Sequence, residues 1–141
     1  MVNQEPQVGY VLKQAQSLLH LRMEEALKPL ALSVTQYSCL HHLRSEPGIS
    51  ASTLARATFV TRQSMNATLQ QLLDRELVSR PAHATSGRAL PTVLTPIGEQ
   101  VLDSAGALID AVEQRMIAGL TDSDQVALAR GLASCVSALE N

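Results

Sequence analysis

The sequence predicts a mainly α-helical fold with one small β-hairpin. Apolar residues recur at spacings of three and four along most of the 141 residues, and N-cap residues precede several of these stretches. Two short strand-like runs flank a mostly polar tip that contains a glycine. The length suits a single domain over residues 1–141, with a core large enough to fold without disulfides or metals.

Four helices are predicted before residue 76. Ser33 and Gln36 form a capping-box pattern, and Ser50 and Thr61 are N-cap residues of two shorter helices. The predicted helices span about residues 8–30, 34–44, 51–57 and 62–75. Because a tight turn joins the third helix to the fourth, this pair predicts a helix-turn-helix.

The second half of the chain continues with a hairpin and two helices. Strands are expected at residues 78–80 and 92–94, and a hairpin directly after a helix-turn-helix is a wing. Thr95 followed by Pro96 marks the start of a helix that runs to about residue 118. The spacing of its apolar residues predicts that Ile97 and Met116 are among those buried. A last helix is expected after Thr121, which fits a capping pattern.

Charge is unevenly distributed along the chain. The sequence holds 11 Lys and Arg against 13 Asp and Glu, a net charge of −2. Residues 50–95 hold five arginines and two acids, whereas the remainder holds six cations and eleven acids. Arginine suits bidentate recognition of phosphates and guanine edges, although a chance cluster on a solvated surface is the alternative. Aromatic residues make up only 2%, which argues against a stacking platform for single strands.

The fourth predicted helix has one apolar and one polar face. Four residues share an arc of about 100° and are expected to face the core: Met65, Leu69, Leu72 and Leu73. The polar face lacks the Glu–Lys pairs of a typical solvated helix and is rich in amides, which read base edges in a major groove. We therefore expect base contacts from five residues, against the alternative of an ordinary solvated surface. They are Arg62, Gln63, Ser64, Asn66 and Gln70.

Short motifs follow one another in a distinctive order. They are Leu-Ser-Val-Thr-Gln-Tyr at 32–37, Ser-Thr-Leu-Ala at 52–55, Thr-Arg-Gln-Ser-Met at 61–65, and Arg88 six residues before Leu-Thr-Pro-Ile-Gly at 94–98. In this order and spacing they resemble the MarR family of winged-helix transcriptional regulators, and the resemblance covers nearly the whole chain.

The resemblance implies a homodimer that binds a pseudo-palindromic DNA operator, as a repressor relieved by a small ligand. The winged helix-turn-helix would cover about residues 32–95. Dimerisation helices at about residues 7–31 and 96–140 would interlock with those of the partner. These helices also have more apolar surface than a small winged domain can cover, which independently favours a dimer.

Further site residues follow from the resemblance. Ser52 and Thr61 fall in matching motifs and are expected at the DNA, and Arg88 at the wing tip is expected in the minor groove. Family members commonly bind small, often aromatic anions in a cleft beside the dimer helices. Four residues are candidates for that lining, with ordinary packing or surface exposure as the alternative for each: His20, Met23, Tyr37 and His41.

Three positions depart from the family pattern. Ser86 stands where an Asp often precedes the wing arginine, so the wing is expected to be less fixed. Glu76 replaces the usual Gly after the recognition helix, so we expect the exit turn to be built differently. Ala67 replaces a further Arg, which predicts lower backbone affinity or a different operator preference.

Other classes of function have little support in the sequence. There is no Gly-rich phosphate loop, GxSxG, CxxC or HExxH motif, so neither an enzyme nor a cofactor is expected. Cys39 and Cys135 lie in apolar helical patterns and are expected to be buried. Cys39 and His42 could share a helix face, but a zinc site would also need His20 or His83.

Two alternatives remain open on the sequence alone: a winged-helix module for protein contacts, and a metal- or thiol-responsive regulator. No apolar run approaches the roughly 18 residues that span a bilayer, and no secretory signal pattern is present at the N-terminus. We therefore expect a cytoplasmic protein with no membrane partner.

Overall fold

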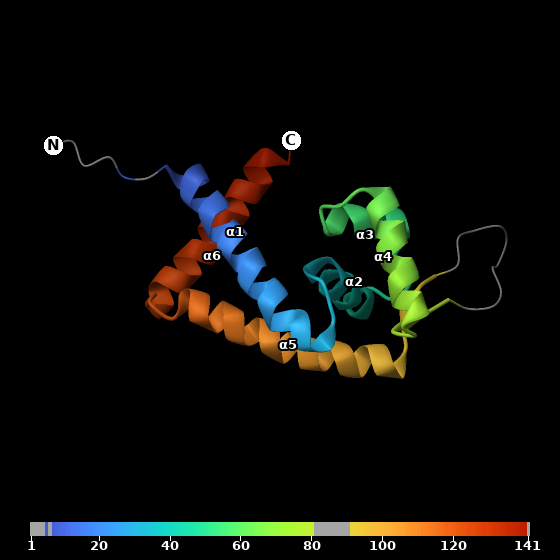
Figure 1. The fold of residues 1–141 in the computed structure, drawn as a ribbon. Helices are drawn as coiled ribbons and strands as arrows, with labels where there is room; N and C mark the ends of the chain where they lie inside the picture. The colour runs from blue at the N-terminus through green and yellow to red at the C-terminus, as the bar shows by residue number, and fades with distance from the viewer. Residues whose placement is uncertain (1–4, 6, 81–90, 141) are drawn as a thin grey trace.

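The structure, a computed structural model, describes residues 5, 7–80 and 91–140 (Figure 1). Its elements are α1 Val8–Leu27, η1 Lys28–Leu30, α2 Val34–Ser45, α3 Ala51–Ala57, α4 Arg62–Asp74, β1 Val78–Ser79, β2 Val93–Leu94, α5 Pro96–Ile117 and α6 Asp122–Leu139. The predicted fold, mainly α-helical with a small β-hairpin after a helix-turn-helix, is confirmed. The strands are shorter than expected, and they pair antiparallel with Val78 opposite Leu94 and Ser79 opposite Val93.

The elements divide into two regions, and α5 contacts both of them (Figure 1). We call residues 32–80 and 91–95 the winged lobe, and α1, α5 and α6 the helical arm. Helix α1 packs along α5, and the N-terminal part of α5 also packs against α2 and β2. Helix α6 then turns back from the far end of α5. The chain therefore carries the helix-turn-helix on one side and the arm on the other.

The hydrophobic core lies almost wholly in the winged lobe. Its fully buried large side chains include Leu40, Leu43, Leu54, Met65 and Leu72. The arm adds only a few buried apolar residues, and α6 has none. Large apolar side chains on the arm are instead exposed: Val8, Tyr10, Val11, Leu12, Leu18, Leu21, Ile97, Met116, Val126, Leu128, Val136 and Leu139. Periodicity had placed Ile97 and Met116 inward, and this was wrong for the single chain, because no part of the described chain covers those faces.

Hydroxyl side chains set the start of every helix from α2 to α6. Ser33, Ser50, Thr61, Thr95 and Thr121 each accept a hydrogen bond from the backbone N–H three residues later. The capping box before α2 is complete, because the Gln36 side chain also accepts from the Ser33 N–H at 3.0 Å. These bonds satisfy orphan donors at the helix starts, and all five N-caps agree with the sequence prediction.

Three helices end on a non-glycine residue in the left-handed conformation. Ala31, Phe59 and Glu76 have φ values of 53°, 59° and 58°. After each, the next backbone N–H donates to the carbonyl five residues earlier, with N–O distances between 3.0 and 3.4 Å. This is the Schellman arrangement, in which glycine is the preferred left-handed residue. The exit turn after α4 therefore adopts a glycine-like conformation at Glu76 and bears the strain of a side chain there.

A close backbone approach fixes the start of α5 beside the end of α4. The Thr95 hydroxyl donates to the Glu76 carbonyl at 2.6 Å, and the Thr95 N–H donates to the Leu77 carbonyl at 3.1 Å. A Cβ on Gly98 would overlap that same Leu77 carbonyl oxygen. Only glycine permits this contact without backbone movement, so the wing base and the arm are joined at a defined distance. Within the described residues, no helix has the length and apolar character that crossing a membrane requires.

Candidate nucleic-acid interface

Helix α4 presents its polar face to solvent, as predicted. Met65, Leu69 and Leu72 are buried, whereas Leu73 is only half-buried. Thr68 is also buried, and its hydroxyl donates to the Ser64 carbonyl at 3.0 Å. The predicted base-reading side chains all lie on the exposed face: Arg62, Gln63, Ser64, Asn66 and Gln70. One helix thus brings five of the predicted site residues together on a single surface.

Helix α3 adds the neighbouring part of this surface. Ser52 is exposed in its first turn, next to Thr53, whose hydroxyl accepts from Ser50 at 2.8 Å. Arg56 donates to the same Thr53 hydroxyl at 3.4 Å. Thr61 is exposed too, but its oxygen is already used as the N-cap of α4, where it accepts from Ser64 at 3.0 Å. Thr61 therefore positions the start of α4 first, and a DNA contact would be additional.

Two amides of α4 are engaged by other side chains. Gln70 donates to Asp74 at 2.9 Å on the same helix. Gln71, on the outward face by periodicity, accepts from Gln36 of α2 at 3.0 Å. Gln71 thus braces α4 against α2, and Gln70 must exchange its bond with Asp74 before it can read a base.

Arg75 ties the end of α4 to the turn that follows α1, a role that sequence analysis missed. Its guanidinium donates to the carbonyls of Ala31 at 2.7 Å and Leu30 at 3.0 Å. Both carbonyls lie just after α1, in the turn where Ala31 is left-handed. Hydrogen bonds from a charged donor are stronger than neutral ones, and the planar guanidinium fixes an angle. Arg75 therefore holds α4 at a set orientation to α1. No local pattern could reveal it, since the bonded residues are more than forty positions apart.

The wing lies only partly within the described residues. At its base, the Arg80 Nε donates to the Thr92 hydroxyl at 3.1 Å, beside the pairing of β1 with β2. Arg80 therefore supports the hairpin. Arg88 and Ser86, which the sequence analysis placed at the wing tip, and His83 lie outside the described residues.

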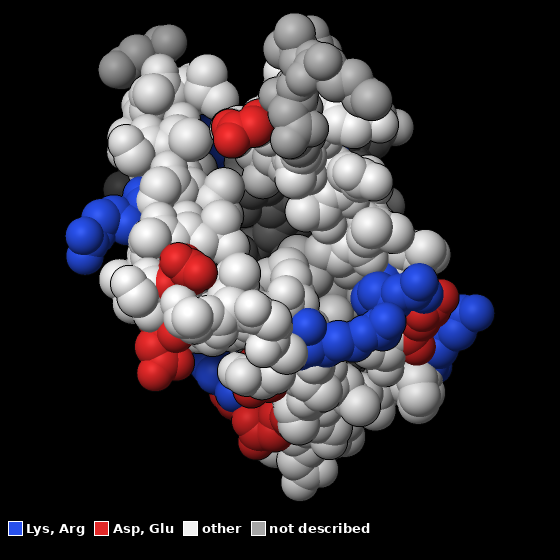
Figure 2. Space-filling view, turned by 90° about the vertical axis from the view of Figure 1, so that its left-hand side faces the viewer, with Lys and Arg blue, Asp and Glu red and all other residues white. Residues whose placement is uncertain are grey.

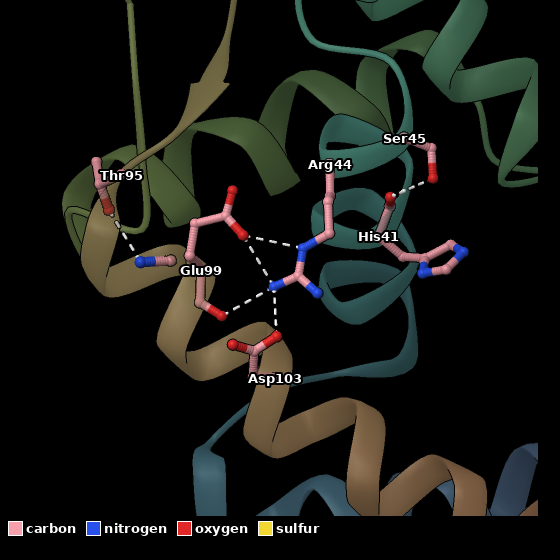
Figure 3. A network of polar contacts seen from close by, with 7 residues as sticks. His41, Arg44, Ser45, Thr95, Glu99 and Asp103 are labelled. Atoms are coloured by element: carbon pink, nitrogen blue, oxygen red, sulfur yellow. Dashed lines mark hydrogen bonds and ion pairs between the residues drawn. The ribbon is translucent and has the colours of Figure 1, made fainter.

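An ion-pair network joins the winged lobe to α5 (Figure 3). Arg44, near the end of α2, contacts Glu99 at 2.9 Å and Asp103 at 2.8 Å, and also donates to the Glu99 carbonyl at 3.0 Å. Hydrogen bonds and attraction from Asp103, with a smaller contribution from Glu99, raise the pKa of Arg44. The network is exposed, so each pair adds little free energy, but together they set the angle between α2 and α5.

The four predicted effector residues lie on α1 and α2, and none of them is in the lining of the hollow between α1 and α5. Tyr37 and His41 stack on α2 with ring centroids 6.1 Å apart, and burial together with nearby Asp110 and Glu113 raises the pKa of Tyr37. His20 lies 3.5 Å from Glu24 on α1, and Met23 is half-buried. Among the described residues, a hollow of about 310 Å³ lies elsewhere, between α1 and α5. Its lining is Ala15, Leu18, Leu19, Arg22, Val112, Arg115 and Met116.

The two cysteines have opposite environments. Cys39 is buried with its Sγ 3.8 Å from the Met65 Sδ, and burial raises the pKa of its thiol to about 12. Such a thiol is a poor nucleophile and a poor metal ligand. Cys135 is exposed, so the prediction that it is buried was wrong for the single chain, because α6 packs little against its own chain. Within the described residues, no three His, Cys, Asp or Glu side chains cluster as a metal site would require.

Comparisons with known proteins agree with this geometry. The MarR family profile matches residues 32–89. The HTH-type transcriptional repressor Rv2887 of Mycobacterium tuberculosis is 39% identical over 118 residues, which cover 84% of this chain and 85% of the repressor. The crystal structure of Rv2887 in complex with DNA has a TM-score of 0.79 and 34% identity, covering 93% of this chain and 98% of that one. Its complex with salicylic acid has a TM-score of 0.77 and 36% identity, covering 96% and 99%.

The similarity extends beyond the helix-turn-helix into the arm, because the matches cover most of this chain and most of the related chain. The structural match covers 96% of this chain, so it includes most of the winged lobe and most of the arm. On this evidence the chain belongs to the MarR family of transcriptional regulators.

Proposed function

We propose that this protein is a homodimeric transcriptional repressor whose α4 reads a pseudo-palindromic DNA operator and whose binding a small aromatic or anionic effector relieves. The observation that carries the proposal is the exposed face of α4, where Arg62, Gln63 and Asn66 stand on a helix braced by Gln36 and Arg75. A rigid frame of this kind suits base recognition, because side chains must meet base edges within hydrogen-bond distance. The proposal includes no enzymatic step and no cofactor.

Each side chain has a role that matches its chemistry. Arg62 suits guanine, and Gln63, Asn66 and Gln70 suit adenine. The hydroxyls of Ser52, Thr61 and Ser64 suit phosphate oxygens or base edges at the groove, and Arg88 is assigned to the flanking minor groove. The Rv2887 complex with DNA supports this assignment, since that repressor shares the fold over most of both chains.

The exposed apolar surface of the arm supports the dimer. Seen from the side of α1 and α6, most of the surface around a central hollow is uncharged, with a few charged side chains scattered over the face and its edge (Figure 2). Exposed apolar patches of this extent mark interfaces, and a two-fold dimer places two copies of α4 one DNA turn apart. Two half-sites also compensate for the few cations that one winged lobe carries.

Two sites for the effector can be compared. The first is the set His20, Met23, Tyr37 and His41, in which the rings of Tyr37 and His41 stack. The second is the hollow between α1 and α5, where Arg22 and Arg115 flank apolar side chains. An aromatic carboxylate needs an apolar slot with a cation at its rim, and the Rv2887 complex with salicylic acid supports an effector of that class.

The decisive experiment is a salt titration of DNA binding with a duplex from the region upstream of the protein's own gene. Arg62→Ala and Arg88→Ala are each expected to weaken binding and to reduce the salt slope by about 1. Lys28→Ala removes an exposed cation outside the winged lobe, so it should leave the slope unchanged and serves as the matched control.

Three results would count against the proposal. Unchanged affinity and slope in both arginine variants would mean that DNA is not read through this face. Absence of DNA binding at low salt, together with a stable protein partner, would favour a winged-helix module for protein contacts. DNA binding that depends on added metal or responds to peroxide would favour a metal- or thiol-responsive regulator.

The effector test uses salicylic acid as the probe. It should weaken DNA binding by the wild-type protein, and either His41→Ala or Arg115→Ala should abolish that response while leaving DNA binding intact. The variant that loses the response identifies which of the two sites is used. If both variants respond as the wild type does, neither site binds the effector.

A further inference from the structure

Phe59 is an apolar side chain that lies almost wholly in solvent. It is 94% exposed, more than any other large apolar residue among those described. It lies in the turn between α3 and α4, away from the arm whose apolar surface the dimer accounts for. A single exposed apolar residue is ordinary on a protein surface, so exposure alone indicates nothing.

The backbone at Phe59 is also strained. Its φ of 59° is left-handed, at the position of a Schellman motif where glycine is preferred. For a bulky residue this conformation is a genuine outlier, and the exposed ring recovers little of that free energy by packing against the described part of the chain. Glycine would fit this turn without strain. A bulky aromatic therefore occupies a site where it opposes folding, and such outliers cluster at functional sites.

The position of Phe59 relative to α4 indicates its partner. Consecutive Cα atoms are about 3.8 Å apart, so the Phe59 Cα lies within about 8 Å of the Thr61 Cα. Thr61 is the N-cap of α4, and Arg62 follows it on the exposed face. Arg56, also exposed, lies three residues before Phe59. An exposed ring at the leading end of α4, with an exposed arginine three residues before it and another three residues after it in the sequence, fits a partner that is anionic and has apolar groups within reach.

Duplex DNA has both properties. Its phosphates are anionic, and the thymine C5-methyl group and the deoxyribose carbons are apolar groups at the edge of the major groove. We propose that Phe59 is a DNA-contacting residue whose ring packs against one of these groups when α4 enters the major groove. This inference rests on the proposed function and adds to it a contact made through apolar surface.

The test compares Phe59→Gly with the wild-type full-length protein. The substitution removes the ring and relieves the backbone strain, so the melting temperature should rise while affinity for DNA falls about fivefold, as for a partly buried aromatic contact. Because Phe59 is uncharged, the loss should be the same at every salt concentration, with an unchanged salt slope. The probe is a duplex that the wild-type protein selects from a random-sequence pool.

Ala31→Gly is the matched control. It relieves the same left-handed strain at the end of η1, and Ala31 is not on the face assigned to DNA. It should therefore stabilise the fold and leave DNA affinity unchanged. A purely structural role for Phe59 would instead move stability and affinity in the same direction.

A second probe separates the two apolar groups. Replacing thymine by deoxyuridine removes only the C5-methyl group. If the ring contacts a methyl, the substituted duplex binds the wild type more weakly and binds Phe59→Gly unchanged. If the ring contacts deoxyribose, Phe59→Gly loses the same factor on both duplexes. Either result supports the contact.

Two results would overturn the inference: Phe59→Gly binding DNA as tightly as the wild type, or Phe59→Gly being less stable. Capture of a protein partner that depends on Phe59, with DNA affinity unchanged, would assign the ring to that partner instead. If the wild-type protein selects no duplex from the pool, the proposed function itself fails, which is a separate outcome.

Discussion

The winged lobe and the helical arm use their apolar residues in opposite ways. The lobe buries Leu40, Leu54 and Leu72 completely, whereas α6 buries nothing although its apolar residues follow an equally regular helical spacing. Both regions have well-formed helices with hydroxyl N-caps. Helix formation and core formation are therefore separate properties here, and the lobe has its core within one chain while the arm depends on a second copy.

The largest effect is expected when a leucine of the winged lobe and a leucine of the arm are each replaced by alanine and the two variants are compared. Leu40→Ala removes a fully buried side chain and should lower the free energy of unfolding by about 2–5 kcal/mol. Leu128→Ala, on the half-exposed face of α6, should change the unfolding of the monomer by less than about 0.5 kcal/mol. It should instead raise the dimer dissociation constant about fivefold. Urea unfolding and analytical ultracentrifugation measure the two quantities. Equal effects of both substitutions on the monomer would contradict the comparison.

The junction between the regions can be tested with two glycines of α5. Gly98→Ala places a Cβ against the Leu77 backbone carbonyl, so it should destabilise the fold by about 1–3 kcal/mol. Gly106→Ala, on the same helix, meets nothing within 4 Å and should raise stability by up to about 1 kcal/mol. Thermal unfolding of both variants shows directly whether each substitution raises or lowers the stability of the fold. A stabilised Gly98→Ala would show that the wing base is not held as the structure describes.

The Arg75 tether should have a smaller effect on stability. Arg75→Ala removes two charge-assisted hydrogen bonds to exposed carbonyls of the α1–α2 turn, with an expected loss of about 1 kcal/mol. Arg75→Lys keeps the charge but not the planar donor pair. If Arg75 sets the angle of α4, the lysine variant should recover stability better than it recovers DNA affinity. If Arg75→Lys recovered both stability and DNA affinity in full, only the positive charge of Arg75 would matter and not its planar pair of donors.

The reactivity of the two cysteines tests the same difference between the winged lobe and the arm, and the measurement does not alter the stability of the protein. Cys39 is buried with its pKa raised to about 12, so almost none of it is thiolate at pH 8, whereas Cys135 is exposed. At concentrations where the dimer dissociates, a thiol-specific reagent should label Cys135 in the folded protein and Cys39 only after unfolding. Cys135→Ser should abolish the native reaction. Labelling of Cys39 at the rate of Cys135 would show that the lobe opens readily.

Local signals in the sequence predicted the fold well. N-caps such as Ser33, Thr61 and Thr95 act within one helical turn, so three or four neighbouring residues suffice to locate them. The outward face of α4 follows from a single helical period in the same way. That is why the site predicted on α4 lies on one exposed surface.

Long-range relations could not be predicted from those signals. Periodicity shows that Met116 and Cys135 lie on helices but not what covers them, so both were wrongly placed inside. Arg75 bonds carbonyls in a distant turn, and Gly98 is required by a carbonyl that only the folded chain brings near. Glu76 adopts the left-handed conformation because the turn after α4 demands it, against the preference of its side chain.

The three left-handed turns also bear on how readily this protein could change. Ala31 and Glu76 each hold about 1 kcal/mol that a single glycine substitution would recover, independently of one another because the turns are separate, whereas the same substitution at Phe59 would also lower DNA affinity. A chain with such reserves can accept destabilising substitutions on its DNA-reading face and compensate elsewhere without altering its core. New operator preferences are therefore within short mutational reach of this scaffold, and Ala31 and Glu76 are the first positions to substitute when a more heat-resistant variant is wanted.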